Sequence, residues 1–231
     1  MPNTGSTDSA NRLPVRIPHG DIELDGDLTV PPRPRGLVAF AHGSGSGRHS
    51  PRNQRVASAL VSAGFATLLM DLLTQAEEEV DVVTREKRFD IPLLAARLIA
   101  AIDWADGEPD VSELPIVTFG ASTGAAAALI AAAERPDRVV GVISRGGRTD
   151  LAGTALDRVL VPSLFIVGGN DEVVREMNED VARRMESPVA IEIVPGATHL
   201  FEEAGALEQV IDHALEALDR WLPAPPAERT E

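Results

Sequence analysis

The sequence has no cysteine, and Lys87 is the only lysine among its 21 basic residues. Without cysteine, disulfide bonds, a thiolate nucleophile and cysteine-bound metal are excluded. No apolar run approaches the ~18 residues that a membrane-spanning helix needs. The first residues, MPNTGSTDSANR, also lack the basic and apolar segments of a signal peptide. We therefore expect a cytoplasmic protein that does not enter a membrane.

Positive charge is scarce as well. The 231 residues include 36 acidic side chains against 21 basic ones, which gives a net charge of −15. Such a charge repels nucleic acid and anionic membrane surfaces. We expect a small-molecule substrate as the partner, with no nucleic acid, no membrane and no cofactor. The composition is compatible with a homo-oligomer.

What the sequence does contain is the pattern of one α/β domain. Its length suits a single domain, and its polar ends predict disordered segments at 1–12 and 223–231 around a domain of residues 13–222. VRIPHGDIELDGDLTVP alternates apolar and polar side chains around a turn, which predicts an antiparallel hairpin. The runs that follow are short and almost continuously apolar, as in strands buried on both faces of a parallel sheet. These runs are GLVAFAH, FATLLMD, LPIVTFG, RVVGVIS, VPSLFIV and VAIEIVP.

Helical segments separate these apolar runs. They are predicted near residues 51–63, 92–105, 122–133, 173–185 and 207–222. This alternation predicts an α/β fold with a doubly wound, mostly parallel sheet that begins with an antiparallel hairpin. The stretch DLLTQAEEEVDVVTREKRFD is charged and weakly periodic, so we expect a surface excursion there.

The segment FGASTGAAAAL contains Gly120-Ala121-Ser122-Thr123-Gly124, a G-x-S-x-G pattern between an apolar run and a predicted helix. In a nucleophile elbow, the serine of this pattern lies on a sharp, strained turn from strand to helix. A serine that caps a helix beside two glycines is the simpler alternative. The strand–turn–helix context favours the elbow, and Ser122 is predicted as a nucleophile.

A serine hydroxyl needs a base, and the base needs an acid that orients it. Among five histidines, His199 lies in EIVPGATHLFEE, after the last predicted strand and at the sheet edge where an elbow would present Ser122. Asp171 follows the run LFIV at the same edge, where capping of the next helix is another use for it. The chain order Ser122, Asp171, His199 matches the order of a catalytic triad in the α/β-hydrolase fold.

An oxyanion that forms at a substrate carbonyl needs N–H donors. The main-chain N–H of Thr123 is one, and the glycine-rich loop HGSGSGRHSPRN supplies the other through the N–H of Ser44. His42 is expected to brace this loop. Arg145 and Arg148 follow the run RVVGVIS and are candidates for binding a substrate carboxylate, although pairing with the acidic surface is an equal alternative.

Two other classes of protein remain as alternatives. A dinucleotide-binding oxidoreductase would have a glycine-rich loop after one strand and an acid, here Asp71, after the next. The glycine spacing fails, because Arg48 or Ser50 stands where the third glycine belongs, and no P-loop sequence occurs. The second alternative is a non-catalytic binding protein on a hydrolase scaffold. No metal-binding motif is present, and we expect no metal.

Together these motifs resemble the α/β-hydrolase superfamily, and within it the dienelactone hydrolase-like branch. The resemblance covers about residues 15–222 and is carried by AHGSGSGRHSPRN, GASTGAAAAL, SRGGRTDL, GGNDEVV and GATHLFEE. It implies that Ser122 is the nucleophile, Asp171 the acid and His199 the base. It also implies that the main-chain N–H groups of Ser44 and Thr123 hold the oxyanion.

Dienelactone hydrolases use a cysteine nucleophile, which this chain lacks. The expected activity is therefore that of a carboxylesterase, which cleaves small or medium esters through an acyl-enzyme. Hydrolases of this fold often carry a lid after the strand that here reads VVGVIS, and residues 148–160 are too few for a separate cap domain. We expect an open cleft.

Overall fold

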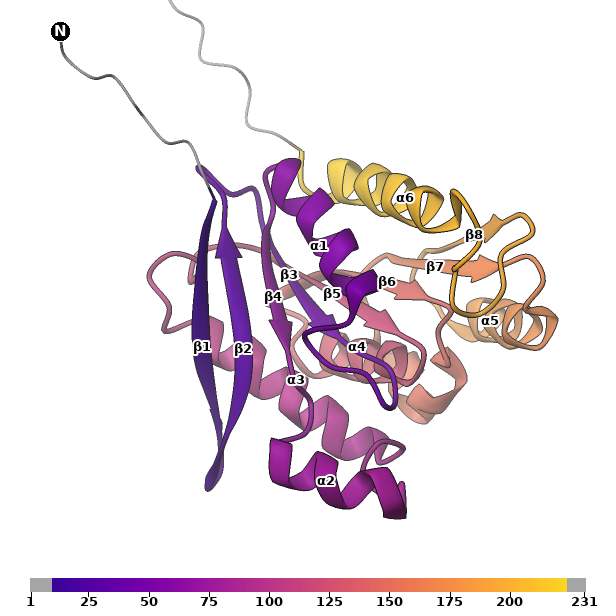
Figure 1. Ribbon diagram of the computed structural model, residues 1–231. Coiled ribbons are helices and arrows are strands. Elements are labelled where there is room, and N and C mark those ends of the chain that lie inside the picture. Colours follow the sequence, from indigo (N-terminus) through magenta and orange to yellow (C-terminus); the bar gives the residue numbers. More distant parts are fainter. Residues whose placement is uncertain (1–9, 224–231) are drawn as a thin grey trace, which may run out of the picture.

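An eight-stranded sheet runs through the molecule (Figure 1). The computed structural model describes residues 10–223. The strands, in chain order, are β1 (Asn11–His19), β2 (Ile22–Val30), β3 (Leu37–Ala41), β4 (Ala66–Met70), β5 (Ile116–Ala121), β6 (Val139–Arg145), β7 (Ser163–Gly168) and β8 (Val189–Val194). Their spatial order is β1-β2-β4-β3-β5-β6-β7-β8. β1 pairs antiparallel with β2 and β2 antiparallel with β4, whereas all later pairs are parallel, which confirms the predicted sheet.

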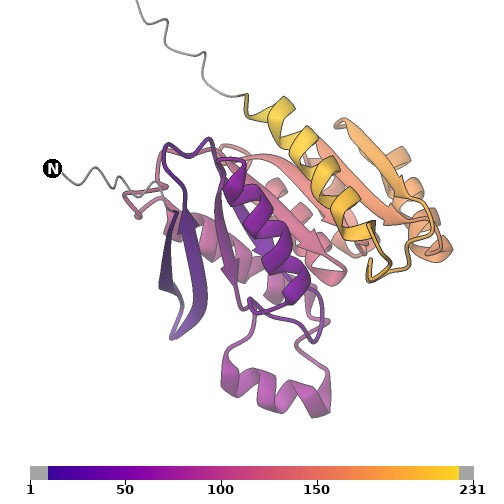
Figure 2. The ribbon, with the colours of Figure 1, turned by 45° about the horizontal axis from the view of Figure 1, so that its top comes forward.

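Helices cover both faces of this sheet (Figures 1 and 2). They are α1 (Pro51–Ser62), α2 (Gln75–Thr84), α3 (Ile91–Ala105), α4 (Thr123–Glu134), α5 (Glu172–Arg184) and α6 (Ala206–Trp221), with a 3₁₀ segment η1 (Thr149–Arg158). α1 and α6 lie together on one face, and α3 and α4 pack against each other on the opposite face. The five predicted helices agree with α1, α3, α4, α5 and α6 to within one residue at either end.

Burial on both faces explains why the parallel strands read as continuous apolar runs. Val38 and Phe40 of β3 pack with the core on the side of α1 and α6. Their neighbours Leu37, Ala39 and Ala41 pack with the core on the side of α3 and α4. Because side chains alternate along a strand, every residue of β3 needs to be apolar.

The chain between β4 and α3 differs from what the sequence led us to expect. The predicted surface excursion contains helix α2, which protrudes from the layers (Figures 1 and 2). Thr74 and Glu77 form a capping box at its start. Glu77 also accepts two hydrogen bonds from the buried Arg97 of α3, both 2.7 Å long. The buried Asp81 carboxylate of the same helix accepts the N–H of Lys87, which lies beyond the helix end, at 2.6 Å.

The N-terminal end of the domain differs from the prediction by two residues. β1 begins at Asn11, so the predicted disordered segment 1–12 extends two residues too far into the fold, because these residues pair with β2. Residues 1–9 of that prediction and residues 224–231 of the predicted tail lie outside the described residues. Between β6 and β7 the described chain forms only η1, and no separate cap domain is built there. None of the helices within residues 10–223 is long and apolar enough to cross a membrane.

Candidate active site

Ser122 makes the turn from β5 to α4. Its backbone angles, φ 51° and ψ −122°, lie in a region that residues other than glycine rarely adopt. Such a conformation costs on the order of 1–3 kcal/mol and persists only where the surroundings impose it. Its N–H donates to the carbonyl of Arg145 at 3.2 Å, and its own carbonyl accepts the Arg148 N–H at 3.0 Å. The side chain does not cap the helix, so the hydroxyl is free for other contacts.

The glycines on either side of Ser122 allow the backbones at the ends of β3 and β5 and at the start of α4 to approach one another closely. A Cβ on Gly124 would overlap the main chain of Ala41 and lie 2.7 Å from the carbonyl oxygen of His42. A Cβ on Gly120 would lie 2.5 Å from the carbonyl oxygen of Gly124. The small residues of the G-x-S-x-G pattern therefore set how closely α4 approaches the end of β3.

His199 lies between Ser122 and Asp171. Its Nε2 is 3.3 Å from the Ser122 Oγ, and its Nδ1 is 2.7 Å from the Asp171 Oδ2. Asp171 stands at the start of α5, but its carboxylate makes no capping hydrogen bond there and contacts the imidazole instead. With the Nδ1–H donated to the carboxylate, the Nε2 lone pair faces the hydroxyl. The three side chains predicted from the sequence are thus in contact in series.

Two residues that the sequence analysis did not single out tie the loops of Asp171 and His199 together. Asn170 donates its main-chain N–H to Ala197 O and its side-chain amide to Gly196 O, both at 2.9 Å. Glu203 accepts the Thr198 hydroxyl at 2.6 Å and the Thr198 N–H at 3.0 Å. The hydroxyl of Thr198 lowers the pKa of Glu203. Asn170 lies in the motif GGNDEVV and Glu203 in GATHLFEE. The sequence does not show that they join these loops; only their tertiary contacts do.

The loop after β3 contacts the start of α4. The Ser44 N–H donates to the Thr123 hydroxyl at 3.1 Å. Thr123 is the first residue of its helix, so its own N–H has no carbonyl partner within the helix. Both predicted oxyanion donors therefore lie beside Ser122. One of them is already hydrogen-bonded, and an oxyanion would share or replace that bond.

The buried imidazole of His42 braces this loop, as expected. Its Nδ1–H donates to the Gly43 carbonyl, and its Nε2 accepts the N–H of Leu72, each at 2.9 Å. Burial lowers the pKa of His42 from its reference value of 6.5, which keeps the ring neutral at neutral pH. His42 thus joins the glycine-rich loop to the chain that leads from β4 to α2.

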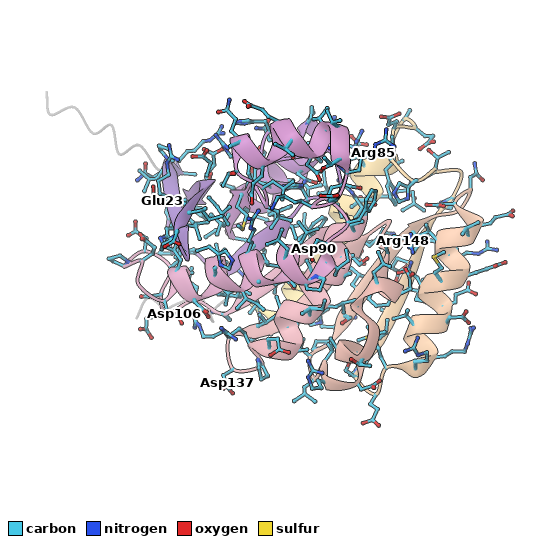
Figure 3. All side chains as sticks on the ribbon, turned by 90° about the horizontal axis from the view of Figure 1, so that it is seen from below. Glu23, Arg85, Asp90, Asp106, Asp137 and Arg148 are labelled. Carbon is cyan, nitrogen blue, oxygen red and sulfur yellow. The ribbon has the colours of Figure 1, made fainter. Side chains whose placement is uncertain are left out.

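The two candidate arginines have different surroundings. Arg148, labelled in Figure 3, donates to both carboxylate oxygens of Asp150, at 2.9 and 2.8 Å. These hydrogen bonds raise the pKa of Arg148 and lower that of Asp150, as in a surface ion pair. Arg145 is only 8% exposed, and its guanidinium group has no hydrogen bond or ion pair with any described residue. Burial, together with the charge of Arg52, lowers the pKa of Arg145 to about 10, so it stays protonated at neutral pH.

A cleft of about 650 Å³ follows the glycine-rich loop. Its lining includes Ser44 of the loop, Arg52 at the start of α1 and Glu78 of α2. Asp71 also lines it and accepts hydrogen bonds from the main chain and the guanidinium group of Arg48. Within residues 10–223, no three His, Asp or Glu side chains gather in a way that could hold a metal ion.

Comparison with known proteins places this geometry in context. Residues 34–222 match a family model described as an alpha/beta hydrolase domain. A solved structure of a dienelactone hydrolase from Anabaena variabilis is 52% identical, with a TM-score of 0.90, and the match covers 92% of this chain and 99% of that one. Est1E from Butyrivibrio proteoclasticus is 18% identical, with a TM-score of 0.72 and coverage of 89% and 98%, which shows a shared fold.

Similar sequences from two strains of Mycobacterium tuberculosis carry the name "Putative phosphoribosyl transferase". They are 52% identical over 211 residues, which amount to 89% of this chain and 47% of theirs. The chain therefore spans about half the length of the curated relatives it matches.

Proposed function

The chain belongs to the α/β-hydrolase family, in its dienelactone hydrolase-like branch, and on this premise we propose that it is a serine esterase. It cleaves small or medium carboxylic esters through an acyl-enzyme. The observation that carries this proposal is the contact series from Ser122 through His199 to Asp171, with distances of 3.3 and 2.7 Å. The positive φ of Ser122 supports it, because nucleophile elbows have this strained conformation.

In the proposed reaction, His199 removes the proton of the Ser122 hydroxyl as its Oγ attacks the ester carbonyl. The N–H groups of Ser44 and Thr123 hold the negative oxygen that results, and each is worth on the order of 3 kcal/mol of barrier. The alcohol leaves with the proton from His199. A water molecule, deprotonated by the same imidazole, then attacks the acyl group, and the acid leaves as Ser122 regains its proton.

Two alternatives have less support. In a dinucleotide-binding protein, the acid at the end of the second strand would bind a ribose, but Asp71 is engaged by Arg48. The name of the mycobacterial relatives describes proteins about twice as long as this chain. Transfer of a phosphoribosyl group gives no reason for a serine, an imidazole and a carboxylate in series, whereas acyl transfer requires them.

A fluorophosphonate probe, which reacts with activated serines, tests the proposal together with p-nitrophenyl esters of increasing acyl length. We expect wild-type protein to be labelled and to hydrolyse the shorter esters, and Ser122→Ala to do neither. Asp171→Asn should lower kcat on the order of 10⁴-fold, because the imidazole loses the acceptor that fixes its tautomer. Ser62→Ala, in which an exposed hydroxyl that donates to the Ser58 carbonyl is removed, is the matched control.

Wild-type protein that is neither labelled nor active on any ester of the series would refute the proposal and favour a non-catalytic binding protein. A thermal shift with a nicotinamide dinucleotide in unlabelled protein would favour the oxidoreductase.

A further inference from the structure

Asn178 is a completely buried polar side chain of α5 that the proposed reaction does not use. Its amide nitrogen donates to the Gly147 carbonyl at 2.8 Å and to the Val174 carbonyl, one turn earlier in α5, at 2.7 Å. Its amide oxygen accepts the hydroxyl of Thr149, also completely buried, at 3.1 Å. Burial of an amide is costly unless its donors and its acceptor find partners. Asn178 therefore ties α5 to the chain that follows β6.

Residues 146–149, which follow β6, form a short loop that we call the β6 loop. They belong to the motif SRGGRTDL, to which the proposed reaction assigns no part. The loop is closely packed, because a Cβ on Gly147 would overlap the Ser144 hydroxyl and lie 2.5 Å from the Ala125 Cβ at the start of α4. It is thus held between the sheet, α4 and the amide of Asn178.

The β6 loop restrains the peptide of the nucleophile. The Arg148 N–H donates to the Ser122 carbonyl at 3.0 Å, and the Ala125 N–H donates to the same oxygen at 3.1 Å. Ser122 has φ 51° and ψ −122°, a conformation that persists only where its surroundings impose it. Arg148 comes directly after Gly147, whose carbonyl accepts from Asn178. A shift of the loop would therefore change a hydrogen bond that restrains the strained serine.

The same loop lies against the imidazole. A Cβ on Gly146 would lie 3.1 Å from the His199 carbonyl oxygen and 3.5 Å from its Nδ1, the atom that contacts Asp171. It would also lie 3.3 Å from the ring of Phe201, which is buried and has a positive φ of 54°. Gly146 itself has φ 53°, so both its missing side chain and its backbone conformation let the loop approach His199.

Helix α5 links this loop to the acid of the triad. Asp171 directly precedes α5, and Asn178 lies two turns along it. α5 also packs against β7 and η1. Because hydrogen bonds within the helix hold its turns together, the Asp171 backbone and the Asn178 amide keep a fixed separation. Through the β6 loop, the positions of Ser122 and His199 are thus set relative to the helix of Asp171.

We propose that Asn178 is a positioning residue, which through the β6 loop fixes Ser122 and His199 relative to Asp171. This inference rests on the proposed esterase function and adds a residue on which the reaction depends. Within residues 10–223, Asn178 has no hydrogen bond to any of these three side chains, so it acts through the loop alone. Its loss should impair the chemical step, in which the imidazole Nε2 takes a proton across 3.3 Å, more than the binding of an ester.

Steady-state hydrolysis of p-nitrophenyl acetate tests this role. In Asn178→Asp a carboxylate oxygen replaces the nitrogen that donates to two carbonyls, which should release the loop. Because a misplacement of the order of 1 Å costs about 10²-fold in rate, kcat should fall about 10- to 100-fold, with KM within about twofold of wild type. Thr149→Val, which removes the hydroxyl that Asn178 accepts, should also lower kcat. Thr149→Ser, which retains that hydroxyl, should keep the wild-type kcat.

Thr118→Val is the matched control, because Thr118 of β5 is also completely buried and its hydroxyl donates to the Ala128 carbonyl at 3.3 Å. All variants are assayed well below their Tm, so that loss of folded protein does not enter kcat. Wild-type kcat in Asn178→Asp and Thr149→Val, or an equal fall in Thr118→Val, would overturn the positioning role while leaving the esterase intact. If Asn178→Asp does not fold, Thr149→Val decides alone.

Amide hydrogen exchange tests the same inference without activity. Because the Arg148 N–H donates to the Ser122 carbonyl, its exchange rate reports whether the β6 loop is held. We expect exchange at Arg148 to be about 10-fold faster in Asn178→Asp and Thr149→Val than in Thr118→Val, and equal rates would overturn the inference. If wild-type protein is not labelled by the fluorophosphonate, the esterase proposal fails, and exchange at Arg148 then decides whether Asn178 positions Ser122 at all.

Discussion

Replacing Gly124 with alanine adds one methyl group at the point where α4 meets the end of β3. The new Cβ would overlap the main chain of Ala41 and lie 2.7 Å from the His42 carbonyl oxygen. Ordinary contact begins near 3.4 Å, so the two segments must separate by at least about 0.7 Å, and by more at the closer carbonyl oxygen of Ala41. The obstructing atoms belong to the backbone and cannot rotate away. The helix that begins directly after Ser122 therefore has to move.

Two magnitudes follow from this displacement. Overpacking of a well-packed site costs roughly 1–3 kcal/mol. In a chain of this length each kcal/mol lowers Tm by about 2–4 °C, so Gly124→Ala should melt roughly 2–12 °C below wild type. A misplacement of the order of 1 Å between reacting groups costs about 10²-fold in rate. Because the Ser122 Oγ moves relative to His199, fluorophosphonate labelling should slow by up to that factor.

Differential scanning calorimetry and the rate of probe labelling measure the two effects separately. Gly107→Ala is the matched control, because a Cβ there would lie 3.5 Å from the Trp104 carbonyl oxygen, in ordinary contact. The reasoning fails if Gly124→Ala has the same Tm as wild-type protein and is labelled at the wild-type rate. Close approach of α4 to β3 would then not be what positions the serine.

Two further predictions concern pH. Burial lowers the pKa of His42 from 6.5 in the folded state, so the unfolded chain takes up a proton at this imidazole first as pH falls. The free energy of unfolding should therefore decline below pH 6.5, by up to ~1.4 kcal/mol per pH unit. Urea titrations of His42→Asn should lack this slope, and those of His19→Asn should keep it. Burial raises the pKa of Glu77, but hydrogen bonds from Arg97 outweigh burial and lower it from 4.5 to about 2. The stability that the ionised Glu77 side chain contributes is complete above pH 4.5 and is lost between pH 4.5 and 2. Glu77→Gln should therefore lower the free energy of unfolding chiefly above pH 4.5. Glu79→Gln, at its exposed neighbour, should leave the acid transition unchanged.

The central sheet follows from the sequence because its strands are buried on both faces. A run such as VAFA has no polar residue to suggest any other location, and the helices between the runs have apolar stripes with clear ends. α2 lacks such a stripe, since Val80, Val82 and Val83 are all exposed. Hydrogen bonds from Arg97 of α3 to Glu77 join it to the domain, and local periodicity does not reveal them. Only the pattern Thr-Gln-Ala-Glu at residues 74–77, a capping box, marks its start in the sequence.

The candidate site was predictable to the extent that topology determines it. Ser122, Asp171 and His199 each follow a strand at the carboxyl edge, so the fold alone brings them together. Contacts between loops were not predictable in this way. The hydrogen bond from Ser44 to Thr123 joins segments 79 residues apart. Arg148 and Arg145 likewise differ because Arg148 pairs with Asp150, whereas Arg145 pairs with no acidic side chain within residues 10–223, and adjacent motif letters do not contain that information.

The single neutral imidazole of His42 also limits how this scaffold can be redesigned. It accepts a hydrogen bond from Leu72, at the start of the segment that carries α2, and holds the loop of Ser44 through Gly43. A graft that exchanges residues 71–90 for a longer lid would remove that donor and release a loop at the opposite side of the cleft. Transplanted lids will therefore be tolerated only when they preserve the backbone at Leu72, even if they never touch a substrate.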